Sequence, residues 1–548
     1  MFVVCGPKNP ERHTLRTEIV EINSKLAAGE IDAAVSLARK AYINDIVDPL
    51  VLSLLAHRRE EMGEFDDALK LLIEAANLDP TDSAIHANIG HCFLKMGLPN
   101  RGIEAFNQAL TLDPDNARAH HGAGLALFSL GDSQSAANAQ QRAHVLQPLY
   151  PDPLGALALI ALQSGQTDLA GYFSDMTLDI EPSEPNAVMV RARLLYDIHD
   201  YTGCIAFVTP HLQGKTASPL QKALLERICA DAEDALGNFS TAFAHYDRCN
   251  ELQHEVFARR YQDLNLETAV QLCDRLQTYF ENFPSEFRES TALKTLAPPR
   301  EHVFLIGFPR SGTTLLEQVL ASHRDVVALE EKPTLNEAIT KYFMLTNDIS
   351  ELVNASNEEL DKCRAQYWDH VHSYNIKFSG KVFVYKQPSL TLYIPLIKKL
   401  FPNSKILFCI RDPRDVVLSC YRRPFTMNTT IYTFTRLNTL CDYYARVMKL
   451  GQTYLSRIPI DCHWHKHEAF VTDFEEELLR LCKFMNLEYD PNMRNFVATA
   501  LRRDIRTPSA AQVRAGLNAT GVGYWRNYQE ALAPYTDILL PWVERFGY

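Results

Sequence analysis

Apolar and small positions in the first half of the chain recur with the spacing of paired helices. Glycine and proline recur every 34 residues, at Gly29, Gly63, Gly97, Gly131, Gly165 and at Pro80, Pro114, Pro148, Pro182. Glycine favours the left-handed turn that ends a helix, and proline cannot continue one. The pattern predicts helix-turn-helix units that stack into an all-α superhelix.

Small residues keep the same register where two helices must approach closely. They lie five residues after each turn glycine, at Ala34, Ala68, Gly102, Ala136 and Ala170. A final unit around Gly237 follows a register slip, and the pattern is degenerate around 201–203. The array resembles the tetratricopeptide repeat, whose concave side commonly holds a peptide or protein ligand. Alternatively, the repeat array packs against the second domain or forms a dimer.

From Glu301 onward, apolar strands alternate with helical stretches, which predicts an α/β domain with a parallel sheet. Ligands of such sheets bind at the carboxyl ends of the strands. We expect strands at the start of this domain, at 381–386 and at 405–410, and a helix over Leu315 to Ser322. The predicted organisation is a repeat array over 1–283, a linker over 284–300 and the α/β domain over 301–548.

A glycine-bounded loop follows the first of these strands and predicts a phosphate site. Gly307 and Gly312 have the spacing of a phosphate-binding loop, in which backbone N–H groups and a helix N-terminus attract an anion. A nucleotide triphosphatase carries Lys after the second glycine, whereas this chain has Thr313. Arg310 is the single cation in the loop, so the loop suits a shorter anion that needs no metal.

Composition narrows the class of protein. The net charge of −12 argues against general nucleic-acid binding. A run of about 18 apolar residues is absent, so no membrane span is expected. The N-terminus does not read as a secretory signal, and the 12 cysteines form no C-x-x-C pair. These features predict a cytoplasmic protein without a zinc site or a disulfide framework.

Three motifs in order resemble those of sulfotransferases, the protein-tyrosine and bacterial repeat-bearing enzymes above all. They are Pro-Arg-Ser-Gly-Thr-Thr at 309–314, Lys386 with Pro388, and a stretch at 401–415 followed by Ser419. The resemblance implies the sulfotransferase fold and an enzyme of EC 2.8.2 type. Its donor would be 3′-phosphoadenosine 5′-phosphosulfate (PAPS), and its acceptor a hydroxyl on a protein tyrosine or a glycan. No metal is implied.

The resemblance also implies roles for individual residues. The loop residues Arg310, Ser311, Gly312, Thr313 and Thr314 match the 5′-phosphosulfate site, and Arg411, Ser419 and Arg423 match further cofactor contacts. Glu331 matches the catalytic base, with its neighbour Glu330 as the second candidate. Lys386 and Arg310 match the groups that stabilise the leaving group, and Ser509 matches a serine that supports the transition state.

The chain departs from the tyrosine-specific pattern at several positions. Tyr524 stands where that family has a cofactor lysine, for which Arg514 or Arg526 would substitute. Pro333 replaces an arginine that helps to hold acidic peptides. His323 lies away from the position of the histidine base of small-molecule sulfotransferases, and we interpret it as structural.

Two other functions remain open from the sequence. The first is a non-catalytic repeat scaffold whose α/β domain keeps a nucleotide pocket. The second is an ATP-dependent kinase with an altered phosphate loop, which the missing Lys after Gly312 disfavours.

Overall fold

The computed structural model describes residues 17–214, 218–262, 267–283, 287, 298–345, 348–503, 505, 507 and 509–548. The chain divides into two compact units, Met1–Ala232 and Glu233–Tyr548. Most of the predicted linker at 284–300 lies outside the described residues. The predicted boundaries at 283 and 301 stay a prediction, because packing alone does not define where the repeat pattern ends.

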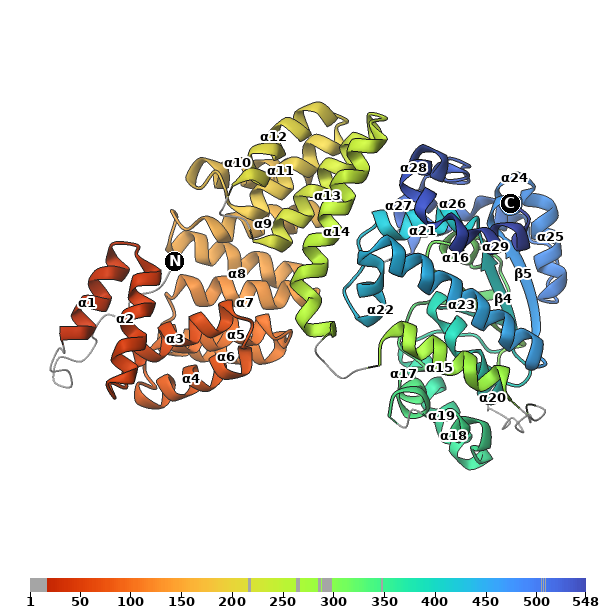
Figure 1. The fold of residues 1–548 in the computed structure, drawn as a ribbon, viewed down its shortest axis with the longest axis horizontal. Coiled ribbons are helices and arrows are strands. Elements are labelled where there is room, and N and C mark those ends of the chain that lie inside the picture. The colour runs from red at the N-terminus through yellow and green to blue at the C-terminus, as the bar shows by residue number, and fades with distance from the viewer. Residues whose placement is uncertain are drawn as a thin grey trace. The chain divides into compact units, whose positions relative to one another are not determined.

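The first unit is built from antiparallel helix pairs (Figure 1). Its helices are α1 (Thr17–Ala27), α2 (Ile31–Ile43), α3 (Pro49–Glu61), α4 (Phe65–Leu78), α5 (Ser83–Lys95), α6 (Pro99–Leu112), α7 (Ala117–Ser129), α8 (Ser133–Leu146), α9 (Pro151–Gln163), α10 (Thr167–Ile180), α11 (Pro185–Asp197), α12 (Tyr201–Gln213) and α13 (Pro219–Ala235), of which α13 continues into the second unit. Consecutive helices pack closely because the predicted small residues face each other. Ala34, Ala68, Ala136 and Ala170 are fully buried.

The turn glycines adopt the left-handed conformation that the repeat requires. Their φ angles run from 73° to 86° between Gly29 and Gly165. The degenerate unit is also a helix pair, α11 with α12, and its turn residue is His199 with φ 66°. His199 lies 34 residues after Gly165, so the structural register continues where the glycine signal is lost. A non-glycine residue in this conformation costs about 1 kcal/mol, which one turn can absorb.

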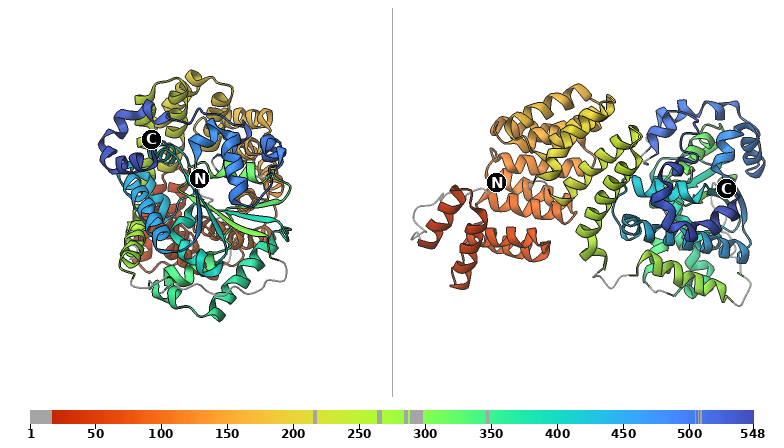
Figure 2. Two further views of the ribbon diagram at one scale, coloured as in Figure 1. Left: turned by 90° about the vertical axis from the view of Figure 1, so that its right-hand side faces the viewer. Right: turned by 45° about the horizontal axis from the view of Figure 1, so that its top comes forward.

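The second unit contains a parallel sheet, confirming the predicted fold class (Figures 1 and 2). Its described strands are β1 (Glu301–Gly307), β2 (Val326–Glu330), β3 (Val382–Lys386), β4 (Lys405–Ile410) and β5 (Asp461–Lys466), in the order β2-β3-β1-β4-β5. In the register, Leu305 of β1 pairs with Lys386 of β3, and Gly307 pairs with Cys409 of β4. The carboxyl ends of β1, β3 and β4 therefore meet at one edge.

Helices cover both faces of this sheet. The longer helices of the second unit are α14 (Phe239–Gln262), α15 (Ala269–Glu281), α16 (Thr313–Leu320), α19 (Asn357–Ser373), α20 (Ile394–Leu400), α21 (Pro413–Arg422), α23 (Leu437–Arg457), α25 (Phe474–Phe484), α26 (Phe496–Arg502) and α29 (Thr536–Phe546). Shorter ones are α17 (Asn336–Ile339), α18 (Ser350–Asn354), α22 (Thr429–Tyr432), α24 (His467–Thr472), α27 (Ala510–Arg514) and α28 (Gln529–Leu532). Helix α16 begins two residues before the predicted Leu315.

Successive side chains of each strand point to opposite faces of the sheet, so each face has its own core. Val303 and Leu305 pack with apolar residues of α16, α25 and α26. His302 and Phe304 point to the other face, where they meet an aromatic cluster that includes Tyr367 and Phe401. The sheet is thus held rigidly from both sides, and its carboxyl edge is a fixed platform for polar side chains. Within the described residues, no helix combines the length and apolar character that crossing a bilayer requires.

Candidate nucleotide-binding site

Two glycines shape the loop between β1 and α16. Gly307 has φ 151°, and a Cβ there would lie 2.6 Å from the backbone oxygen of Cys409. Gly312 has φ 89°, and a Cβ there would lie 2.4 Å from Nδ1 of His467. Both positions therefore exclude larger residues, and α16 can begin directly after the loop with its N–H groups free to bind an anion.

Arg310 is held at the centre of the loop by residues from two other segments. Its backbone has φ 71°, which is unusual for a residue with a side chain. Its guanidinium donates to Ser419 Oγ at 2.9 Å, to Gln512 Oε1 at 2.9 Å and to Ser509 Oγ. Burial and two neighbouring arginines lower the pKa of Arg310 to about 10. The side chain thus keeps its charge at neutral pH in a fixed orientation.

The loop opens into a cavity of about 280 Å³. Seven of the predicted site residues line it: Arg310, Gly312, Thr314, Arg411, Ser419, Arg423 and Ser509. The sequence separation between these residues reaches about two hundred positions, and the structure brings them to one edge of the sheet. The three predicted arginines that meet here have the chemistry to bind an anion with more than one charged group.

The remaining predicted cofactor residues lie outside the set that lines this cavity. Ser311 and Thr313 are buried at the start of α16. Arg514 points to the backbone oxygens of Ala500 and Arg503, at 3.4 Å from each. The guanidinium of Arg526 lies over the ring of Trp525.

Buried polar atoms face the cavity without a partner in the described part of the chain. Nε of Arg411 and Nδ1 of His467 are buried and accept or donate no hydrogen bond there. Burial, followed by Arg411 and two further neighbours, lowers the pKa of His467 to about 3, so its ring is neutral. Unpaired buried polar groups are costly, and an anionic ligand that binds them would remove that cost. The residues present fit a nucleotide with phosphate groups.

The carboxyl-terminal segment forms one wall of the cavity. Asp415 of α21 accepts hydrogen bonds from the backbone N–H groups of Gly523 and Trp525, at 2.7 and 2.8 Å. Tyr524 lines the cavity and donates to Asp234 at 2.9 Å. Asp234 also pairs with Arg422. Neither Asp234 nor His467 was predicted as a site residue.

The predicted catalytic pair lies at the ends of β2 and β3. Lys386 is fully buried, and its Nζ lies 2.6 Å from Glu331 Oε1 and 3.0 Å from Glu330 Oε1. Glu331 is the more accessible of the two, with a side-chain exposure of 38% against 12% for Glu330. Burial opposes the charge of Lys386, but the carboxylates around it outweigh burial and raise its pKa.

Glu317 joins this pair to the phosphate loop and was missed from the sequence. It lies on α16, is fully buried, and its carboxylate is 3.8 Å from Lys386 Nζ and 3.0 Å from Nη2 of Arg503. Burial raises its pKa, and the two cations oppose that shift. The signal available was an acidic residue within the otherwise buried turn from Leu315 to Leu320. A charge there is stable only beside cations.

The contacts of His323 support the interpretation that this residue is structural. Its Nε2 lies 2.8 Å from the backbone oxygen of Glu488, and its Nδ1 accepts from the N–H of Asp325 at 2.9 Å. Both ring nitrogens are engaged, so the ring holds the turn after α16.

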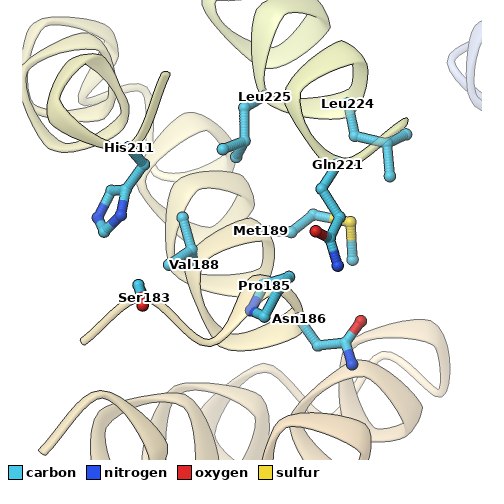
Figure 3. Close-up of a pocket in the computed structure, with 9 residues that line it drawn as sticks. All are labelled: Ser183, Pro185, Asn186, Val188, Met189, His211, Gln221, Leu224 and Leu225. Carbon is cyan, nitrogen blue, oxygen red and sulfur yellow. The ribbon is translucent and has the colours of Figure 1, made fainter. Parts of the chain in front are cut away.

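A second, smaller hollow occurs in the repeat unit, between α11, α12 and α13 (Figure 3). Its volume is about 40 Å³, and Val188, Met189, His211 and Leu225 are among its lining residues. That space accommodates only a few water molecules. It does not fit a nucleotide or a peptide side chain of any size.

The second unit thus combines a parallel sheet with a glycine-bounded loop after β1 that contains Arg310 and lacks the lysine of triphosphatases. Residues 302–491 match the model of the sulfotransferase family, and residues 59–126 match a tetratricopeptide-repeat model. The chain therefore combines a sulfotransferase-family domain with tetratricopeptide repeats. Both resemblances stated from the sequence are confirmed.

Known proteins match each half. An uncharacterized protein of Aquifex aeolicus (strain VF5) is 28% identical over 260 residues, which is 44% of this chain and 32% of that protein. A putative protein-tyrosine sulfotransferase of Caenorhabditis briggsae is 24% identical over 45% of this chain and 88% of its own length. Among solved structures, Pseudomonas aeruginosa pilF covers 40% of this chain and 93% of its own, with 21% identity and a TM-score of 0.31. This chain thus spans about a third of the Aquifex protein.

Proposed function

We propose that the protein is a sulfotransferase that uses PAPS as donor and a hydroxyl group as acceptor. The observation that carries the proposal is Arg310, fixed by Ser419, Ser509 and Gln512 in a cavity that also contains Arg411 and Arg423. A nucleotide with phosphate groups at two positions of its ribose needs two cationic subsites. The loop with Arg310 would bind the 5′-phosphosulfate, and Arg411 with Ser419 the 3′-phosphate.

The catalytic step follows from the Glu331 and Lys386 pair. Glu331 would take the proton of the acceptor hydroxyl while the acceptor oxygen forms a bond to sulfur. The bond between sulfur and the bridging oxygen breaks, and 3′-phosphoadenosine 5′-phosphate leaves with the electron pair. Lys386 and Arg310 would stabilise the charge that develops on that oxygen, and Ser509 would support the transition state. Positioning and electrostatics carry the rate enhancement, as in phosphoryl transfer, and no metal is required.

The accessibility of the carboxylates favours Glu331 over Glu330 as the base. Glu331 has the greater side-chain exposure and can reach a substrate, whereas Glu330 is largely covered. Close contact with Lys386 keeps the Glu331 carboxylate in place. A base must lie within hydrogen-bond reach of the proton that it takes, so exposure matters here as much as basicity.

The acceptor belongs to the class of hydroxyl groups on proteins, peptides or glycans. The relative from Caenorhabditis briggsae is named as a putative protein-tyrosine sulfotransferase. We propose that the repeats select the acceptor or a partner protein. Pro333 in place of the peptide-binding arginine argues for an acceptor other than a strongly acidic peptide.

Calorimetric titration of the full chain with 3′-phosphoadenosine 5′-phosphate tests the donor, with ATP·Mg²⁺ and 5′-AMP as controls. We expect binding to the 3′-phosphorylated nucleotide and at least 100-fold weaker binding of 5′-AMP, because the 3′-phosphate subsite would be empty. Preference for ATP would favour the kinase alternative. An acceptor screen with labelled PAPS then separates an enzyme from a scaffold, since a scaffold binds the donor without turnover.

A further inference from the structure

A cluster of three potential metal ligands lies on β5 and α25, and none of its residues lines the nucleotide cavity. His463 and His465 are two residues apart on β5, so their side chains share one face of the strand. Glu477 of α25 packs against that face. One ligand atom from each of the three residues lies within 4.8 Å of the other two.

The two imidazoles lack the partners that buried polar groups normally have. His465 is 1% exposed, and its Nδ1 has no hydrogen-bond partner among the described residues. Nε2 of His463 is also buried without a partner there. Glu477 is 6% exposed, and Arg480 pairs with its Oε1, which leaves the second oxygen available. Buried ring nitrogens without a partner, on two histidines beside a buried carboxylate, need an explanation beyond packing.

We propose that His463, His465 and Glu477 bind a divalent cation of the zinc class. Two imidazole nitrogens and one carboxylate oxygen form a ligand set that Zn²⁺ commonly takes, with water as the fourth ligand. In a tetrahedral site with metal bonds of about 2.1 Å, ligand atoms lie roughly 3.4 Å apart. No gap in the cluster therefore has to close by more than about 1.4 Å, a shift of the size that side-chain rotations produce.

One charged group beside the cluster has to be accommodated. Arg480 pairs with Glu477 and also with Glu476, and its side chain is 57% exposed. It can therefore keep its contact with Glu476 when Glu477 turns toward the two histidines.

The cation would be structural and would fasten the edge strand of the sheet. β5 pairs with β4 on one side only, and it leads directly into His467 and Glu468. His467 lines the nucleotide cavity, and Glu468 Oε1 accepts from the N–H of Asp412 at 2.9 Å. A metal that ties β5 to α25 would hold this connection in place. The sequence analysis expects no metal in this protein, and the proposed cation departs from that expectation. The proposed sulfuryl transfer itself would still need no metal.

The test is calorimetric titration of the untagged, chelator-treated full chain with zinc chloride. We expect one zinc ion per chain, and at least a 100-fold loss of affinity in the double variant His463→Gln, His465→Gln. The matched control is His372→Gln, an exposed histidine of α19, which should bind zinc like the unmodified protein. Equal zinc binding by the double variant and the unmodified chain would overturn the proposal.

A second measurement covers the case in which the double variant folds poorly. Glu477→Gln removes one ligand charge and preserves the shape of the side chain. Zinc should raise the melting temperature of the unmodified chain and of His372→Gln, and should leave that of Glu477→Gln almost unchanged. A similar rise in Glu477→Gln would also contradict the proposal. Binding of 3′-phosphoadenosine 5′-phosphate, measured on the same samples, distinguishes a failure of this site from a failure of the proposed function.

Discussion

The Oε1 atom of Glu331 lies 2.6 Å from Nζ of Lys386, and the backbone N–H of Glu331 donates to the backbone oxygen of Lys386 at 2.9 Å. The proposed base and the proposed leaving-group cation are therefore linked twice. Because β2 and β3 are neighbours in the sheet, neither residue can shift without the other. The ion pair between Glu331 and Lys386 orients both side chains before any substrate binds.

Glu331→Gln should lower turnover by roughly 100-fold or more, the usual scale for loss of a general base, while donor binding stays within a few fold. The measurement is a steady-state rate with labelled PAPS, beside calorimetry with 3′-phosphoadenosine 5′-phosphate. Glu330→Gln is the matched control, since Glu330 contacts the same lysine but is largely covered. A fully active Glu331→Gln enzyme would show that the base is another group.

Arg310→Ala should weaken binding of 3′-phosphoadenosine 5′-phosphate by about 100-fold or more, because charge-assisted bonds to a fixed guanidinium are among the strongest polar contacts. Calorimetry measures the change. Arg526→Ala serves as the control, and we expect a change of less than about threefold because Arg526 lies over Trp525. If the two variants bind alike, the loop is not the phosphate site.

Glu317→Ala should destabilise the second unit by about 3 to 5 kcal/mol, because it removes one counter-charge of the fully buried Lys386 and the carboxylate partner of the partly buried Arg503. Differential scanning calorimetry reports the shift in melting temperature. Glu330→Ala should cost less, since the Glu330 side chain is 12% exposed whereas that of Glu317 is fully buried. Equal melting temperatures for Glu317→Ala and the unmodified chain would mean that the buried carboxylate contributes nothing to the fold.

Glu184 of the repeat unit should make stability depend on pH. It accepts from the N–H of Ala187 at 2.6 Å at the start of α11, and burial raises its pKa from 4.5 to about 7. A carboxyl group whose folded pKa lies above its unfolded value binds more protons in the folded state. Its contribution to stability is therefore present below pH 4.5 and is lost as the pH rises through about 7.

Glu184→Gln should accordingly flatten the fall in melting temperature of the repeat unit between pH 5 and pH 8, where amide and carboxylate differ most. Thermal melting followed by circular dichroism at several pH values checks this. The control is Glu181→Gln in the same turn, where hydrogen bonds from Ser183 lower the pKa and the sign is opposite. An unchanged pH profile in Glu184→Gln would contradict the assignment.

Local sequence signals were enough to predict the helical repeats and the loop between β1 and α16. The 34-residue glycine period predicted the helix pairs, and Gly307 and Gly312 with an apolar strand before them predicted the glycine-bounded loop between β1 and α16. Both signals arise from backbone conformation, which a single sequence encodes directly. His199 shows the limit, because the structure keeps the turn after the glycine is lost.

The residues that the sequence analysis missed have contacts with residues that are far away in the sequence. Glu317 is recognisable as functional only once Arg503 and Lys386 are seen beside it. His467 and Asp234 likewise become part of the cavity only through tertiary packing. Arg514 and Arg526 were inferred as substitutes for one lysine from their position near Tyr524, and sequence proximity does not fix the direction of a side chain.

The strand order separates the residues proposed to bind the donor from the residue proposed to deprotonate the acceptor. Anion-binding groups come from β1 and β4, at the centre of the sheet and on one side of it, whereas Glu331 follows β2 at the opposite edge. Under the proposed function, changes in the segment after β2 would alter which hydroxyl is presented without disturbing the arginines around Ser419. The choice of acceptor would then be open to modification while the proposed donor pocket stays constant, and the domain would be a practical starting point for engineering new sulfation targets.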